Sequence, residues 1–133
     1  MRALPLIVAG LALSACAAQP PTATRTAENQ VKLDKLLAGK AAGSPITCLP
    51  HYQAGDMIRI DDSTIAFKRG TRVYVNHLQG ACSNLTSGFY SLVTKSNGQG
   101  LCRGDIAEVR DNQTGTIVGA CGIGDFIPYS NPT

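Results

Sequence analysis

The segment Met57–Cys82, MIRIDDSTIAFKRGTRVYVNHLQGAC, contains the densest run of β-strand signals in this sequence. Apolar and polar residues alternate in three short runs, which are Ile58–Ile60, Ile65–Phe67 and Val73–Val75. The polar Asp61–Ser63 and the two-residue turn Arg69–Gly70 separate these runs, and this order predicts an antiparallel meander with one apolar face. Because three strands cannot bury such a face alone, other parts of the chain must complete the core.

The composition favours short strands and turns over long helices. The chain has 133 residues, of which only 16% are charged, with 14 Gly and 7 Pro, so it has room for one small domain. Basic residues are interspersed with acidic ones, the net charge is +3, and Trp is absent. This pattern lacks the clustered positive charge and the aromatic side chains of nucleic-acid-binding proteins, so no nucleic-acid partner is predicted.

Further strand signals follow the meander. Gly88–Lys95 alternates as a strand, and Asn97–Gly98 is a hairpin signal that leads toward Leu101. Asp105–Val109 and Gly115–Ala120 flank a turn-rich loop, so they are expected to pair as a hairpin. We therefore predict an all-β fold of about six antiparallel strands, closed into a small barrel or a sandwich so that few strand edges stay free.

One short helix is expected before the strands. Glu28–Ala38 has apolar residues at helical spacing, with Thr26 as the N-terminal cap and Gly39 as the stop. The alternative is that this stretch frays as part of a tether. Lys40–Pro45 is predicted to be a linker, the β domain to span 46–129, and residues 130–133 to form a tail.

The beginning of the chain has the pattern of an export signal. Met1–Arg2 is followed by the largely apolar Ala3–Leu13 and then by Ser14–Ala15–Cys16, which predicts a signal peptide over residues 1–15. The sequence Leu13–Cys16 resembles the lipobox of bacterial lipoproteins. This resemblance implies a lipid anchor on Cys16 with a flexible lipidated tether after it, and the lack of an aspartate after Cys16 implies an outer-membrane location facing the periplasm. The alternative is an ordinary signal-peptidase cut nearby.

The other four cysteines, Cys48, Cys82, Cys102 and Cys121, predict two structural disulfides. An even number of cysteines in an exported chain, with no C-x-x-C pair, favours disulfides over zinc or redox chemistry. The hairpin of the second half is expected to bring Cys102 and Cys121 to the same end, which leaves Cys48 with Cys82. The alternative pairs Cys82 with Cys102 and Cys48 with Cys121. By the chain-entropy model, each bridge stabilises the fold by roughly 3 to 4 kcal/mol.

No motif for catalysis, a metal or a cofactor is found, so none is predicted. His51 and His77 are isolated, and Asp61–Asp62 is interpreted as a polar corner because adjacent side chains point apart. A concave surface that held Arg59, Tyr74 and His77 together would be the first candidate for a binding site.

The domain resembles a family of small bacterial secreted proteins and lipoproteins with no assigned activity. The segments that carry this resemblance are Cys48–Leu49, Asp61–Phe67, Val73–Leu78, Cys82, Leu101–Asp105 and Cys121–Phe126. A weaker resemblance, to periplasmic lysozyme inhibitors, is carried by Ser87–Tyr90. The first resemblance implies an exported location and this kind of fold. Because no motif for catalysis, a metal or a phosphate is found, we predict a lipid-anchored envelope protein that is a non-enzymatic binding or structural module, with the membrane and an envelope protein as partners. The alternative is an inhibitor of a wall-degrading enzyme such as lysozyme.

Overall fold

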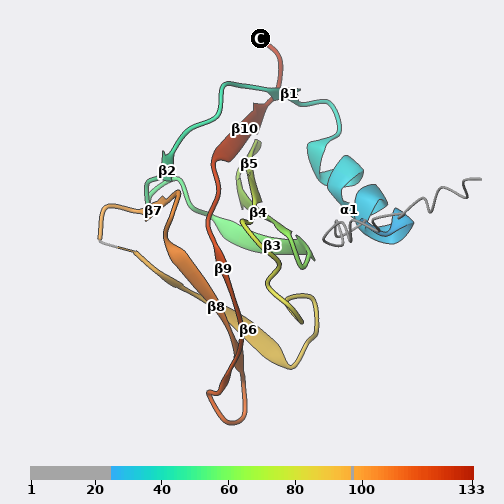
Figure 1. Ribbon diagram of the computed structural model, residues 1–133. Coiled ribbons are helices and arrows are strands. Elements are labelled where there is room, and N and C mark those ends of the chain that lie inside the picture. Colours follow the sequence, from blue (N-terminus) through green and yellow to red (C-terminus); the bar gives the residue numbers. More distant parts are fainter. Residues whose placement is uncertain (1–24, 97) are drawn as a thin grey trace, which may run out of the picture.

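The computed structural model describes residues 25–96 and 98–133 (Figure 1). The predicted signal peptide over residues 1–15, the lipobox with Cys16, the tether up to residue 24, and Asn97 of the hairpin signal lie outside the described residues.

The described chain is mostly β-structure, and its helix precedes the strands. In order, the elements are α1 (Ala27–Leu37), β1 (Ala41–Ala42), β2 (Cys48–Leu49), β3 (Asp56–Asp61), β4 (Thr64–Arg69), β5 (Arg72–His77), β6 (Tyr90–Lys95), β7 (Leu101–Cys102), β8 (Ile106–Asp111), β9 (Ile117–Gly122) and β10 (Phe126–Ser130). The strands form three antiparallel sheets with the orders β1-β10-β5-β4-β3, β2-β7 and β6-β8-β9. The prediction of a small, disulfide-stapled all-β domain behind one short helix is therefore confirmed.

The helix has the predicted caps. Thr26 is the N-cap residue, and its side-chain oxygen accepts a hydrogen bond from the backbone N–H of Asn29 at 3.2 Å, which satisfies one of the free donors of the first turn. Gly39 has φ +71° just after the last turn, where a residue with a side chain would be strained. The helix does not fray as a tether, because Leu33 is buried against the sheet.

The meander forms as predicted, with one shift at its second turn. β4 and β5 pair so that Phe67 lies opposite Tyr74 and Arg69 lies opposite Arg72. The turn residues are therefore Gly70 and Thr71, one position later than predicted, and Gly70 takes φ +58°. A two-residue turn in this region of φ suits the twist of a hairpin.

The prediction that the meander has one apolar face is wrong, because both faces are buried. Ile60, Ala66 and Val75 belong to a cluster on the side of α1. Ile65 and Phe67 belong to the larger cluster on the other side, which also holds residues of β8, β9 and β10. Figure 1 accordingly shows α1 on one side of β3 to β5, with β6, β8 and β9 away from the helix. The continuous burial of Thr64–Phe67, the first four residues of β4, reflects this position between two apolar layers.

The second half pairs differently from the sequence prediction in one respect. β8 and β9 form the expected hairpin, but β6 pairs with β8, while β7 pairs with β2. Gly98–Gly100 is thus a connection between two sheets. Gly100 takes φ +124°, and a Cβ there would lie 2.4 Å from the carbonyl oxygen of Leu49, so only glycine fits beside β2.

The structure contradicts the predicted disulfide pairing. Cys48 is joined to Cys102, and Cys82 is joined to Cys121. The two cysteines of the first bridge lie directly opposite each other in the β2–β7 pair, with Cα atoms 4.0 Å apart.

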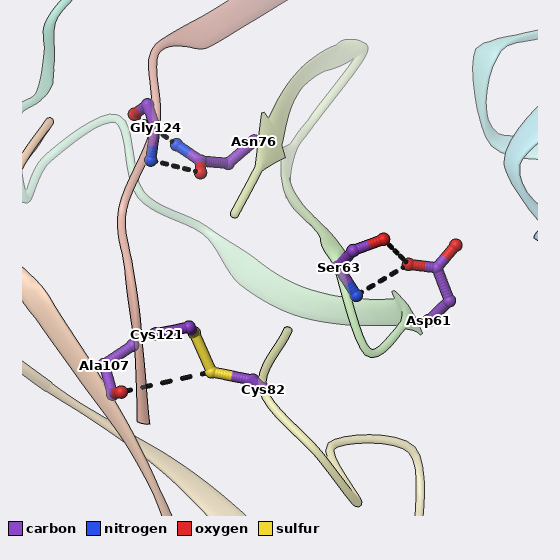
Figure 2. The surroundings of a disulfide bond; sticks show 7 residues. All are labelled: Asp61, Ser63, Asn76, Cys82, Ala107, Cys121 and Gly124. Carbon is purple, nitrogen blue, oxygen red and sulfur yellow. Dashed lines mark hydrogen bonds between the residues drawn. A yellow bond between two sulfur atoms is a disulfide. The ribbon is translucent and has the colours of Figure 1, made fainter. Parts of the chain in front are cut away.

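The expected Cys102–Cys121 bridge fails because Cys121 lies opposite Ala107 in the hairpin, not opposite Cys102. Between Cys102 and β8 the chain makes a turn at Gly104, with φ +90°, so Cys102 belongs to a different sheet. Cys82 instead lies over the hairpin, with its Sγ 3.9 Å from the Ala107 carbonyl oxygen (Figure 2).

The pairing also extends beyond residues 46–129 at both ends. Ala41, within the predicted linker, pairs with Ser130, within the predicted tail. The first and last strands of the described chain therefore lie side by side at the edge of the five-stranded sheet.

Candidate functional site

A hollow of about 400 Å³ opens beside the β4–β5 hairpin. Its lining residues come from the hairpin and from the turn before β3, and they are Tyr52, Gln53, Arg69, Gly70, Thr71, Arg72 and Tyr74. Volumes of this size are typical of sites for small ligands.

The register of the hairpin sets the two arginines side by side. Arg69 and Arg72 are the last pair before the turn and lie directly opposite each other. Side chains of directly opposite residues leave the same face of a sheet, with Cβ atoms about 4.5 to 5.5 Å apart. Since Phe67 and Tyr74 are also opposite partners two residues further along, all four share the face that carries the larger core cluster.

A second segment closes the hollow on the other side. Gln53 and Ala54 donate their backbone N–H groups to the carbonyl of Pro50, at 2.9 and 3.1 Å, and this turn carries Tyr52. Gly55 then lets the chain pass tightly over β4, because a Cβ at Gly55 would lie 2.0 Å from the carbonyl oxygen of Lys68. This close passage holds Tyr52 next to the hairpin arginines.

The arginine pair has no counter-ion within residues 25–96 and 98–133. No side-chain hydrogen bond or ion pair joins Arg69 or Arg72 to another group there, and both are exposed. The carboxylate of Asp56 lies opposite Lys68, hence on the other face of the sheet. Like charges directly opposite in a ladder destabilise it, so the pair carries a cost that the described protein groups do not offset.

The other described arginines all have partners. Arg25 binds Asp61, Arg59 donates to the carbonyls of Leu85 and Tyr90, Arg103 binds Asp125, and Arg110 binds Glu108. In the last case Lys95 lies at 2.9 Å from the same carboxyl group. The hydrogen bonds from Arg110 and Lys95 lower the pKa of Glu108 below its usual range. Among the described residues, the two hairpin arginines thus differ from the other arginines by lacking such hydrogen bonds and ion pairs.

The two tyrosines of the hollow have different environments. Tyr74 is buried, with 4% of its surface exposed, whereas Tyr52 is 69% exposed. An exposed aromatic ring next to two guanidinium groups provides an apolar surface with polar groups around it. Such a surface fits a ligand that has an anionic group on a larger body.

The opposite end of the meander, at Asp61–Asp62, is held by internal contacts. Arg25 donates to Asp61 at 2.7 Å and to the hydroxyl of Thr64 at 2.7 Å, while Ser63 donates to the other carboxylate oxygen of Asp61. Partial burial raises the pKa of Asp61, but the hydrogen bonds from Arg25 and Ser63 outweigh burial and lower it overall. Asp61 is thus part of a polar corner whose side chains bind one another, which agrees with the interpretation of this segment from the sequence.

The structure does not bring Arg59, Tyr74 and His77 together. Tyr74 lines the hollow, but Arg59 is held by backbone carbonyls near Leu85. His77 lies opposite Thr64, at the far end of the strand, and desolvation together with the nearby Arg25 charge lowers its pKa. His51 is an exposed residue of the turn before β3 and does not line the hollow.

The arginine pair was missed by the sequence analysis, although a signal existed. The sequence Arg69–Gly70–Thr71–Arg72 has one arginine on each side of two turn residues. If those two residues form the turn, both arginines close the hairpin on one face. Because the sequence analysis assigned Arg69 to the turn, it did not predict that Arg69 and Arg72 lie opposite each other.

The Ser87–Tyr90 loop carries the resemblance to lysozyme inhibitors. In this loop, Tyr90 donates its N–H to the Ser87 carbonyl at 3.4 Å, and Phe89 is 75% exposed.

Among the described residues, no group of three or more His, Cys, Asp or Glu side chains is arranged to hold a metal ion. The same residues include no helix that is long and apolar enough to cross a membrane.

The chain matches no protein-family model, no curated protein and no solved structure.

Proposed function

We propose that this protein is a lipid-anchored protein of the bacterial envelope whose β domain is a non-enzymatic binding module for an anionic ligand. The hairpin site binds the ligand, and Cys16 carries the lipid. One observation supports this proposal most strongly: Arg69 and Arg72 lie opposite each other on one face, beside an open hollow, with no counter-ion in the described chain.

Ligand binding gives a physical reason for this arrangement. Arginine offers a planar fork of N–H donors that matches a carboxylate or a phosphate in bidentate fashion. Two forks on one face of a hairpin can bind the same anionic group from two sides. A bound anion would also relieve the repulsion between the two arginines, so the ligand and the hairpin stabilise each other.

The predicted anchor supports an envelope location. The lipobox resemblance at Leu13–Cys16 implies two or more acyl chains, which give stable membrane attachment where a single chain would be marginal. An exported location also permits the two disulfides of the domain. We infer an outer-membrane anchor that faces the periplasm.

The anchoring half of the proposal is tested by Cys16→Ser in the full chain. The wild-type protein should incorporate a labelled fatty acid and fractionate with membranes, whereas the variant should incorporate none and should remain as an uncleaved precursor or a soluble form. Equal labelling and equal fractionation of the two proteins would overturn the lipid anchor.

The binding half is tested on the same Cys16→Ser background, with Arg69→Gln and Arg72→Gln combined. The parent protein should be retained on a carboxylated matrix and eluted by salt, and the double variant should elute earlier. The matched control is Lys35→Gln with Lys40→Gln, which removes two charges from the helix and the segment after it. If both double variants elute together, only net charge matters, and the hairpin is not a binding site.

A second candidate function is inhibition of a wall-degrading enzyme such as lysozyme. The observation that favours it is the exposed ring of Phe89 in the Ser87–Tyr90 loop, because a projecting aromatic side chain is a common anchor in inhibitor interfaces. Stoichiometric inhibition of lysozyme that is lost in Phe89→Ala, and kept in the Arg69→Gln, Arg72→Gln variant, would favour this function over the first.

A further inference from the structure

We infer that the ligand of the hairpin site is an acidic glycan, bound through one of its anionic sugar units. This inference rests on the proposed function and specifies its ligand class. Four properties of the site carry it: the interior position of β4 and β5 in the sheet, the aromatic surface beside the arginines, the exposure of the hairpin tip, and the position of the hairpin relative to the point where the chain enters the domain.

The first property argues against an extended acidic peptide. Extended peptides commonly bind by adding a strand to a sheet edge, where backbone hydrogen bonds supply much of the affinity. The strands of the hairpin, β4 and β5, are interior strands, because β3 pairs with β4 and β10 pairs with β5. The backbone groups of both strands are already used in the sheet, so neither strand can pair with an added peptide strand.

The second property argues for a ligand with a ring-shaped body. A free phosphate or carboxylate would contact the two guanidinium groups and leave most of the hollow of about 400 Å³ empty. Tyr52, which is 69% exposed, borders the remaining space. A sugar ring has apolar C–H faces that pack on an aromatic ring and hydroxyl groups that suit Gln53 and Thr71, two polar residues of the same hollow.

The open position of the site fits a polymer better than a small free metabolite. Arg69, Gly70, Thr71 and Arg72 are all exposed at the tip of the hairpin. A chain of sugars can therefore continue past the bound unit on either side.

The fourth property argues against a membrane surface as the ligand. The described chain begins at Arg25, which is bound to Asp61 and Thr64 at the β3–β4 corner. The hairpin lies at the other end of β4, a six-residue strand and therefore about 17 to 20 Å from that corner. In Figure 1 the N-terminal end of α1 and the β4–β5 turn accordingly lie far apart. If the domain is attached to the membrane through the chain that enters at this corner, the hairpin lies at the opposite end of β4 from the attachment point and is directed away from the membrane.

The test measures binding of defined probes to the full-length Cys16→Ser protein by isothermal calorimetry. The probes are a short oligogalacturonate, the same oligosaccharide with its carboxyl groups reduced to alcohols, poly-glutamate of matched charge, and vesicles of phosphatidylglycerol. We expect the oligogalacturonate to bind and the reduced form not to bind. The combined Arg69→Gln, Arg72→Gln variant should lose about tenfold or more in affinity.

Two further variants separate charge from geometry. Arg69→Lys with Arg72→Lys keeps both charges but removes the planar forks, and it should weaken oligogalacturonate binding severalfold without abolishing it. Tyr52→Ala should weaken the oligosaccharide and leave poly-glutamate binding unchanged. The control Lys35→Gln with Lys40→Gln should bind every probe like the parent protein.

The outcomes distinguish this inference from the proposal on which it rests. If poly-glutamate or the vesicles bind more tightly than the oligosaccharide, in an arginine-dependent manner, the glycan is the wrong class and the anion-binding function stands. Equal binding of the reduced oligosaccharide, or of the Tyr52→Ala variant, likewise overturns the glycan inference. If no anionic probe responds to the arginine variants, both the inference and the binding function fall.

Discussion

The two ends of the β4–β5 pair use charge and polarity in opposite ways. At the end that contains Thr64, Asn76 and His77, each strand is bound to other parts of the chain. Arg25 donates to the Thr64 hydroxyl, the Asn76 side chain binds the backbone of Gly124, and the segment after His77 leads to the Cys82–Cys121 bridge. At the other end, no hydrogen bond or ion pair from the part of the chain that the structure describes holds the side chains of Arg69 and Arg72.

This difference indicates which end maintains the fold and which is available to a ligand. Polar groups that are buried must be paired, since an unpaired one costs several times what a typical hydrogen bond contributes. At the bound end, Asn76 and Gly124, which are far apart in sequence, pair in this way (Figure 2). The exception among the described residues is Asp62 Oδ1, which is buried without a hydrogen-bond partner. The hairpin end is exposed, so solvent can hydrate the arginines, and substitutions there need not affect folding.

The largest effect is expected at the bound end, from removal of the Cys82–Cys121 bridge. Cys82→Ala combined with Cys121→Ala opens a loop with a sequence separation of 39 residues, for which the chain-entropy model gives about 4 kcal/mol. Both cysteines are also buried in the main core cluster, so lost packing adds to this value. The measurement is the free energy of unfolding by denaturant, with disulfides mapped in the oxidised protein.

The matched control is Cys48→Ala with Cys102→Ala. This bridge has a sequence separation of 54 residues, so its loop-entropy contribution is nearly the same, but Cys48 is exposed. The Cys82–Cys121 variant should therefore be the less stable of the two. Within each bridge, the double variant should be no worse than the corresponding single ones, because either single change already opens the loop. A reversed order would show that burial of the bridge does not stabilise this end.

The second effect concerns Asn76, which is fully buried. Its Nδ2 donates to the Gly124 carbonyl at 2.8 Å, and its Oδ1 accepts from the Gly124 N–H at 3.0 Å (Figure 2). Asn76→Ala leaves both backbone groups unpaired in the interior and should cost about 2 to 4 kcal/mol of unfolding free energy.

An exposed asparagine provides the control for this substitution. Asn131→Ala removes an acceptor for Lys40 at the surface and should change stability by less than about 0.5 kcal/mol. If Asn76→Ala is equally mild, water replaces the side chain, and the contact with Gly124 does not stabilise the connection between β9 and β10.

Local features of the fold were predictable because short segments specify them. The helix has its cap and stop within the segment Thr26–Gly39, and the meander has its alternating runs and turns within Met57–Cys82. The β8–β9 hairpin likewise has its loop between its strands. In each case the interacting residues are close in sequence, so the local sequence pattern is enough to predict which residues pair.

The disulfide pairing and the candidate site depend on contacts between segments that are distant in sequence, and no local sequence pattern predicts such contacts. Cys48 meets Cys102 through the two-residue strands β2 and β7, which are too short to show an alternation. The burial of both faces of β4 depends on α1 and on the second half of the chain. The hollow needs Tyr52 beside Arg69, which follows only from the close passage of Gly55 over Lys68.

The smallest effect on stability is expected at the hairpin end, and its sign is opposite to that of the other two. Arg69→Gln combined with Arg72→Gln removes a repulsion between directly opposite charges, and it breaks no side-chain hydrogen bond or ion pair within the described residues. The variant should therefore be as stable as the parent protein or more stable by a few tenths of a kcal/mol. The gain should shrink as salt is added, because salt screens exposed charges. Thermal unfolding at low and at high ionic strength measures both quantities. A decrease of more than about 1 kcal/mol in the free energy of unfolding would mean that the two arginines stabilise the fold as Arg25 and Asn76 do. The proposal that the hairpin is a ligand site would then be wrong.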